Sequence, residues 1–334
     1  MRKSNNNKSN KLKHMRLFLI VALLSIVFPA HSSTYEERPT EYPTYSAFVN
    51  DISIAYQDFG DPKNDAILLV MGLGGQLIHW DDDLVFKLVD EGYRVIRFDN
   101  RDAGWSQKFY QAPTPGLVTG IRFKLGLSLN SPYKLDDMAA DAYALLEYLN
   151  VERAHVVGLS MGGMIAQIMA AKYTDRVVSL TSIMSTTSAK HLPAGSIELQ
   201  PRADKQTREG AIESSVSVAR LIDGSVAELS DEQWRKQIAR GYDRAHYTDG
   251  FDRQLWAILD SGDRVALLNT VKQPTVVIHG TEDTLIPHAA GEHTAEQING
   301  AKLVLIEGMG HYLDQVSKPK VIREILSVAA QAAR

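Results

Sequence analysis

The sequence predicts an α/β fold, a mostly parallel sheet flanked by helices with a helical cap inserted between two strands. Continuous apolar runs, typical of strands buried on both faces, alternate with segments of helical periodicity. This alternation favours βαβ units and therefore a parallel sheet. Residues 188–268, called the cap below, interrupt the pattern with polar and amphipathic segments. Because strand-like runs resume after the cap, an insertion is favoured over an independent second domain.

The expected elements follow in chain order. A hairpin joined at Asn50-Asp51 opens the sheet, and the remaining strands are apolar runs that end near glycine or polar residues. The expected strands are Ala47–Val49, Ile52–Tyr56, Ala66–Met71, Tyr93–Phe98, His155–Val157, Val177–Met184, Thr275–His279 and Lys302–Ile306. Helices are expected over residues 138–149, over Met161–Ala171 and from Lys318 onward, and in the cap around Phe251, Leu255, Ile258 and Leu259.

Charge is distributed unevenly along the 334 residues. The formal charge is −4, yet the first 32 residues carry six Lys and Arg and no acid, which leaves 30 basic against 40 acidic residues in the rest. A body with a charge of −10 is a poor candidate for binding nucleic acid, because no basic surface remains to meet phosphates. Cysteine is absent, which excludes disulfides, cysteine–zinc sites and thiol catalysis.

The first 32 residues have the layout of a secretory signal peptide. A basic stretch precedes the apolar run Leu17–Phe28, and Ala30-His31-Ser32 offers a small-residue cleavage site. The run is short for a bilayer span, which takes about 20 residues, although an uncleaved anchor and a start at Met15 remain open. We therefore expect an exported protein, periplasmic or secreted, with no stable membrane insertion after cleavage. Residues 33–44 are expected to form a linker, and residues 45–187 and 269–334 the core domain.

A candidate nucleophile lies in Gly158-Leu159-Ser160-Met161-Gly162, called the elbow below, which matches G-x-S-x-G. A serine hydroxyl is a weak nucleophile that must be presented to a base, and a strand-to-helix turn presents it. Taken alone, the G-x-S-x-G pattern is weak evidence, because it also occurs by chance. Here it follows a buried strand and opens a helix, which is the context that the motif requires. Ser160 is therefore the predicted nucleophile.

The acid and the base are expected after later strands. Asp283, in His279-Gly280-Thr281-Glu282-Asp283, follows one buried strand, and His311 follows the next after a glycine-rich loop. Asp283 could instead only cap a turn, and Glu282 is the rival acid. The chain order serine, acid, histidine, each just beyond a strand, is nevertheless that of an α/β-hydrolase triad. His311 would then take the Ser160 proton, and Asp283 would fix the imidazole tautomer.

An oxyanion hole needs two preorganised N–H donors. We expect them to be the backbone N–H of Met161, directly after the nucleophile, and that of Leu73 in Met71-Gly72-Leu73-Gly74-Gly75, called the oxyanion loop below. A glycine-rich loop could instead cradle phosphate. This one lacks both the P-loop lysine pattern and the dinucleotide-binding spacing.

These motifs, in this order, resemble the α/β-hydrolase superfamily over about residues 45–330. The stretch Asp99–Ser106, of the form D-x-R-x-x-G-x-S, with Met71-Gly72 in place of the usual His-Gly, is similar to the aclacinomycin methylesterase-like branch. The resemblance implies a carboxylic ester substrate, a helical cap over the site and no cofactor or metal. The long segment 107–134 exceeds the usual connection and is expected to shape the pocket entrance.

The predicted function is hydrolysis of small or medium-sized carboxylic esters through an acyl-enzyme. A carbon–carbon bond hydrolase, an aminopeptidase or a perhydrolase with the same triad, or a ligand-binding protein with little turnover, remains an alternative, because cap and pocket set the chemistry beyond the triad. Nothing in the sequence indicates the acyl or alcohol group or the oligomeric state. The candidate substrate-binding residues are Gly72, Gly74, Trp234, Phe251 and Trp256, the last three being aromatic residues of the cap.

Overall fold

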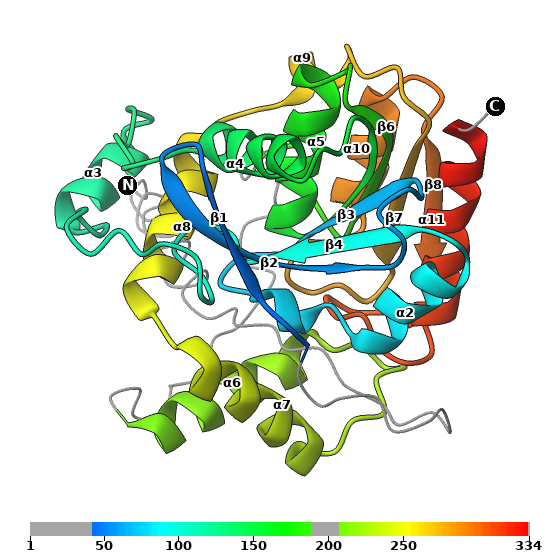
Figure 1. Ribbon diagram of the computed structural model, residues 1–334. Coiled ribbons are helices and arrows are strands. Elements are labelled where there is room, and N and C mark those ends of the chain that lie inside the picture. Colours follow the sequence, from blue (N-terminus) through cyan, green and yellow to red (C-terminus); the bar gives the residue numbers. More distant parts are fainter. Residues whose placement is uncertain (1–41, 189–206, 333–334) are drawn as a thin grey trace, which may run out of the picture.

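The computed structural model describes residues 42–188 and 207–332. Its centre is an eight-stranded sheet in the order β1-β2-β4-β3-β5-β6-β7-β8 (Figure 1). The pairs β1–β2 and β2–β4 are antiparallel and all other pairs are parallel. This arrangement confirms the predicted fold class. The expected signal peptide, nearly all of the linker and residues 189–206 of the cap lie outside the described residues.

The elements alternate as the sequence pattern predicts. The strands are β1 (Tyr45–Val49), β2 (Ile52–Phe59), β3 (Ala66–Val70), β4 (Arg94–Phe98), β5 (Ala154–Leu159), β6 (Val177–Ile183), β7 (Thr275–Gly280) and β8 (Lys302–Ile306). The helices are the 3₁₀ turn η2 (Leu77–His79), α2 (Asp82–Asp90), α3 (Leu117–Lys124), α4 (Leu135–Tyr148), α5 (Met161–Lys172), α6 (Arg208–Ile222), α7 (Asp231–Ala245), α8 (Thr248–Asp260), α9 (Val265–Leu268), α10 (Ala289–Gln297) and α11 (Lys318–Ala332).

Two hydrophobic cores cover the two faces of the sheet. Successive side chains of a strand point to opposite faces. Accordingly, Leu68 and Val70 of β3 pack with α4 and α5, while Ile67 and Leu69 pack with α2 and α11. Figure 1 shows α2 and α11 together on one side of the sheet and α4, α5 and α10 on the other. Every β3 side chain is buried, which explains why the strand reads as a continuous apolar run.

Between β6 and β7 the described chain, from residue 207 to 268, is helical and contributes no strand to the sheet. Helices α6 and α7 pack against each other and lie below the sheet in Figure 1. The short helix α9 packs instead on α5 and α10 of the core domain. The last turn of the predicted cap range thus lies against the core helices.

The segment 107–134 contains one helix, α3, which projects from the body beside α8 in Figure 1. Its connection to α8 is polar, because Asp260 at the end of α8 accepts hydrogen bonds from the backbone N–H groups of Leu129 and Ser131 at 2.7 and 3.0 Å. In the part of the chain that the structure describes, no helix has the length and apolar character needed to cross a membrane.

Candidate active site

Ser160 lies at a sharp turn between β5 and α5, as the elbow pattern predicts. Its backbone has φ 55° and ψ −119°, a strained conformation for a residue with a side chain. The turn is held by hydrogen bonds from the Ser160 N–H to the Ile183 carbonyl at 2.9 Å and from the Ser185 hydroxyl to the Ser160 carbonyl at 2.8 Å. A methyl group at Gly162 would lie 2.0 Å from the Val70 carbonyl oxygen. The helix can approach the sheet this closely only with glycine there.

Ser160, His311 and Asp283 form one hydrogen-bonded chain. The Ser160 Oγ lies 2.9 Å from His311 Nε2, and His311 Nδ1 lies 2.6 Å from Asp283 Oδ2. All three residues are at most 7% exposed. With the Nδ1 proton donated to the carboxylate, Nε2 is left as the acceptor for the serine proton. The geometry is that of a general base poised on a serine hydroxyl.

The Asp283 carboxylate is held in its charged form. Burial alone would raise its pKa, but the neighbouring His311 and the hydrogen bonds from His279 and His311 outweigh burial and lower the pKa to about 2. The other oxygen, Oδ1, accepts from the backbone N–H groups of Leu285 and Ile286 at 3.0 and 2.8 Å. These bonds fix the carboxylate in one orientation toward His311.

The sequence reasoning missed the second histidine at the acid. His279 is fully buried at the end of β7, with its Nε2 3.3 Å from Asp283 Oδ2 and 2.8 Å from the Ile286 carbonyl oxygen. An N–H shared between these two oxygens makes His279 a second donor to Oδ2, the same carboxylate oxygen that His311 contacts. The available signal was the His-x-x-x-Asp spacing at the end of a buried strand.

The rival acid, Glu282, lies elsewhere. Its carboxylate accepts from the backbone N–H and the hydroxyl of Ser225 at 2.7 and 2.8 Å. Glu282 therefore connects the core domain to the segment that follows α6, and Asp283 is the residue that reaches His311.

The cap also contacts the backbone of residues 307–311, which follow β8. The His311 N–H donates to the Ile222 carbonyl at the end of α6 at 2.6 Å, and Gly224 pairs with Met309 in an isolated antiparallel bridge. Gly224 has φ +77° and closely abuts Gly310, so a side chain would not fit. The position of His311 thus depends on residues about ninety positions earlier in the chain.

The oxyanion loop runs alongside the nucleophile. A methyl group at Gly72 would lie 3.2 Å from the Ser160 Cβ, so the Gly72–Leu73 peptide and Met161, the first residue of α5, both adjoin Ser160. The Gly75 N–H donates to the Gly72 carbonyl at 3.1 Å, and the Asn100 side-chain amide donates to the Met71 carbonyl at 2.9 Å. The replacement of the usual histidine by Met71 leaves this loop in a closed turn.

The three cap aromatics that we predicted to bind substrate are buried. Trp234 is 1% exposed and its ring centroid lies 4.6 Å from that of Tyr312, the neighbour of His311. Phe251 and Trp256, both on α8, are 8% and 6% exposed. Trp234 therefore packs on the residue that follows His311. Substrate contact by these aromatics stays a prediction.

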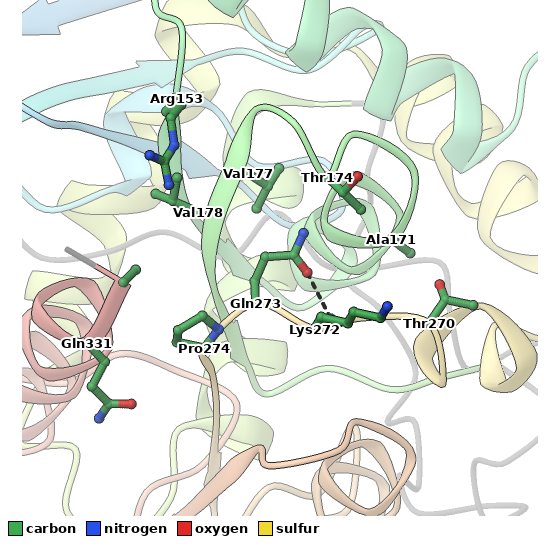
Figure 2. Close-up of a pocket in the computed structure, with 11 residues that line it drawn as sticks. Arg153, Ala171, Thr174, Val177, Val178, Thr270, Lys272, Gln273, Pro274 and Gln331 are labelled. Carbon is green, nitrogen blue, oxygen red and sulfur yellow. Dashed lines mark hydrogen bonds between the residues drawn. The ribbon is translucent and has the colours of Figure 1, made fainter. Parts of the chain in front are cut away.

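One cavity of about 780 Å³, shown in Figure 2, lies away from these residues. Its lining includes Arg153, Val177 and Pro274, which stand at the amino ends of β5, β6 and β7. Ser160 follows the carboxyl end of β5, and a six-residue strand spans about 20 Å. The cavity is thus at the opposite edge of the sheet from the triad.

Within residues 42–188 and 207–332, no cluster of His, Asp and Glu has the makeup of a metal site.

Comparison with known proteins agrees with this geometry. Residues 65–313 match the family model described as alpha/beta hydrolase fold. Rhodomycin D methylesterase DnrP of Streptomyces peucetius is 28% identical over 314 residues, covering 86% of this chain and 96% of that protein. The 3-oxoadipate enol-lactonase 2 of Acinetobacter baylyi is 23% identical, covering 81% of this chain and 90% of that protein.

Solved structures show the same fold. The enol-lactonase from Burkholderia xenovorans LB400 superposes with a TM-score of 0.64 at 23% identity, covering 86% of this chain and all of that one. The meta-cleavage product hydrolase from Pseudomonas fluorescens IP01 superposes with a TM-score of 0.67 at 19% identity, covering 86% of this chain and 98% of that one. With its sheet order, its elbow and a family match over three quarters of its length, the chain belongs to the α/β-hydrolase fold family.

Proposed function

We propose that this protein is a serine hydrolase that cleaves carboxylic esters of small or medium-sized substrates through an acyl-enzyme. The observation that carries the proposal is the chain from Ser160 Oγ to His311 Nε2 at 2.9 Å and from His311 Nδ1 to Asp283 Oδ2 at 2.6 Å. The similarity to a rhodomycin D methylesterase over 86% of the chain supports an ester as the substrate class.

The mechanism follows from the geometry. Ser160 Oγ attacks the acyl carbon while its proton passes to His311 Nε2, and the resulting imidazolium is stabilised by the ionised Asp283. The oxyanion of the tetrahedral intermediate accepts hydrogen bonds from the N–H groups of Leu73 and Met161. His311 then protonates the departing alcohol. Water then attacks the acyl carbon while its proton passes to His311 Nε2. The bond to Ser160 Oγ breaks, the carboxylic acid leaves, and His311 returns the proton to Ser160.

The test is turnover of p-nitrophenyl esters from acetate to octanoate by residues 33–334. We expect release of p-nitrophenol with a chain-length optimum that reports the size of the acyl pocket. A fluorophosphonate should label one serine, and peptide mass analysis should place the label on Ser160. If no ester in the series is turned over, the esterase proposal fails. A carbon–carbon hydrolase or a ligand-binding protein would then account better for the fold.

Export is the second part of the proposal. The basic, apolar and small-residue order of residues 1–32 supports a signal peptide that is removed near residue 32. Expression of the full chain in a Gram-negative host should yield periplasmic protein whose amino terminus, sequenced chemically, lies close to Ser33. Full-length protein retained in the membrane fraction would favour an uncleaved anchor, and full-length cytoplasmic protein would overturn export.

A further inference from the structure

Gln254 on α8 connects the cap to two loops of the core domain at once. Its side chain is fully buried. The Oε1 accepts a hydrogen bond from the Gly74 N–H at 2.8 Å, and the Nε2 donates to the Arg101 carbonyl at 2.7 Å. The first contact is on the oxyanion loop and the second is in the Asp99–Ser106 stretch. One cap side chain thus satisfies two backbone groups that lie 180 and 153 residues away in the sequence.

The contact at Gly74 acts on the orientation of the Leu73 N–H. A trans peptide is planar, so the N–H of Leu73 points opposite to the carbonyl of Gly72. The Gly75 N–H holds that carbonyl at 3.1 Å. Gln254 holds the next peptide unit, between Leu73 and Gly74, through its N–H. The peptide planes on both sides of Leu73 are therefore fixed, one within the loop and one by the cap.

Among the described residues, the side-chain hydrogen bonds from the core domain lie on either side of the middle of this loop. Asn100 donates to the Met71 carbonyl at 2.9 Å, and Asp99 accepts from the Leu77 N–H at 2.6 Å. Both contacts flank the segment 72–75. Gly74 itself has φ +67°, and glycine moves readily between conformations unless it is held. Within residues 42–188 and 207–332, Gln254 is the side chain that holds the middle of the loop by a hydrogen bond, at the Gly74 N–H.

We propose that Gln254 is a positioning residue that orients the Leu73 N–H toward the oxyanion, so that docking of α8 completes the oxyanion hole. The inference rests on the serine esterase mechanism proposed above. Donors preorganised for an oxyanion stabilise the transition state more than the bound ester. Loss of the Gln254 contact should therefore lower kcat and leave KM nearly unchanged, because Gln254 acts through the loop and does not touch the substrate.

The primary variant is Gln254→Met, which keeps the length of the side chain and removes both hydrogen bonds. We expect kcat for the best p-nitrophenyl ester to fall about 10-fold or more, since removal of a whole oxyanion donor costs about 10²- to 10³-fold, with KM within about 3-fold of the native value. Rates are normalised to Ser160 titrated to completion with a fluorophosphonate, so unfolded protein does not count as slow enzyme.

A transition-state probe separates positioning from general damage. Butylboronic acid adds to Ser160 Oγ, with the proton passing to His311, and forms a tetrahedral anionic adduct whose oxygen occupies the oxyanion hole. Its affinity should fall in proportion to kcat in Gln254→Met, whereas the affinity of butyrate as a competitive product should not change. Equal weakening of both ligands would contradict a role in the oxyanion hole.

Two further variants complete the test. Ser261→Ala, at the end of the same helix, removes the acceptor of the Leu135 N–H at 2.9 Å and serves as the matched control for a lost contact between α8 and the core. Gln254→Glu retains an acceptor for the Gly74 N–H but replaces the donor to the Arg101 carbonyl with a second carboxyl oxygen, so it should recover kcat only to the extent that this buried carboxyl is protonated and donates to the carbonyl. Should Gln254→Met not accumulate as folded protein, Gln254→Asn, whose amide is one methylene too short, takes its place with the same expectations.

The proposal is overturned if Gln254→Met loses no more kcat than Ser261→Ala, or if the loss is in KM alone. These outcomes differ from failure of the esterase function itself, which would appear as absence of turnover in the native protein.

Discussion

Replacing Ser160 with alanine is expected to lower kcat for p-nitrophenyl ester hydrolysis by about 10³- to 10⁶-fold, because the triad acts as a unit and only binding and the oxyanion donors remain. The fluorophosphonate label should disappear with the activity. The measurement is steady-state hydrolysis of the best ester in the series, with the variant purified separately from any native enzyme.

The matched control for this change is Ser179→Ala. Ser179 is also a buried serine, on β6, and its hydroxyl lies 2.8 Å from His155 Nδ1, near the amino ends of the strands and thus at the edge opposite the triad. We expect its kcat to stay within about 2-fold of native and its free energy of unfolding to fall by about 1 kcal/mol, the usual value of a lost buried hydrogen bond. A Ser160→Ala enzyme that retained a tenth of native activity would disprove the serine mechanism.

Replacing Asp283 with asparagine is expected to lower kcat by about 10³- to 10⁴-fold. The N–H groups of Leu285 and Ile286 require the amide oxygen at the Oδ1 position, so the NH2 group faces His311 Nδ1 and favours the wrong imidazole tautomer. The charge that stabilises the imidazolium is also lost. Because the pKa of Asp283 is about 2, the native carboxylate stays ionised throughout the pH range of an esterase assay. Its protonation should not contribute to the acid limb of the native pH–rate profile between pH 4 and pH 8.

Glu282→Gln is the control, since it changes the adjacent carboxylate in the same way. Its contacts are with Ser225, and we expect kcat within about 3-fold of native. If Glu282→Gln instead gave the larger loss, the assignment of the acid would be wrong. The two neighbouring variants thus decide, in a single assay, which of the rival acids supports His311.

The cap contacts both the catalytic histidine and the oxyanion loop. The end of α6 holds the His311 N–H through the Ile222 carbonyl, and Gln254 of α8 holds the Gly74 N–H. If the cap moved away as a rigid body, it would break the hydrogen bond to the His311 N–H and the hydrogen bond to the Gly74 N–H. Opening of the whole cap for substrate entry would therefore disturb the positions of His311 and of the oxyanion loop. We expect the reaction to take place with the cap docked.

Local patterns in the sequence were sufficient for the fold and for the order of the triad. Buried strands are recognised in the sequence as apolar runs. The hairpin turn is indicated by Asn50-Asp51, and both residues adopt positive φ in the structure. The elbow is likewise a short-range signal, since its glycines and Ser160 lie within five residues. Three short helices, α2, α3 and α10, were not predicted. Each has eight or nine residues, which is too few turns for the helical periodicity to be recognised.

What only the tertiary structure decided is which polar groups meet. Polar contacts distinguish Asp283 from Glu282 as the acid and join His279 to the Asp283 carboxylate. Hydrogen bonds likewise join Ile222 and Gln254 to the catalytic loops. Each depends on distances of about 3 Å. Most join residues that lie tens to nearly two hundred positions apart, and a polar side chain leaves no periodic trace of its partner. Hydrophobic burial is encoded by repetition along the chain, whereas the pairing of buried polar groups emerges only when the packed elements bring them together.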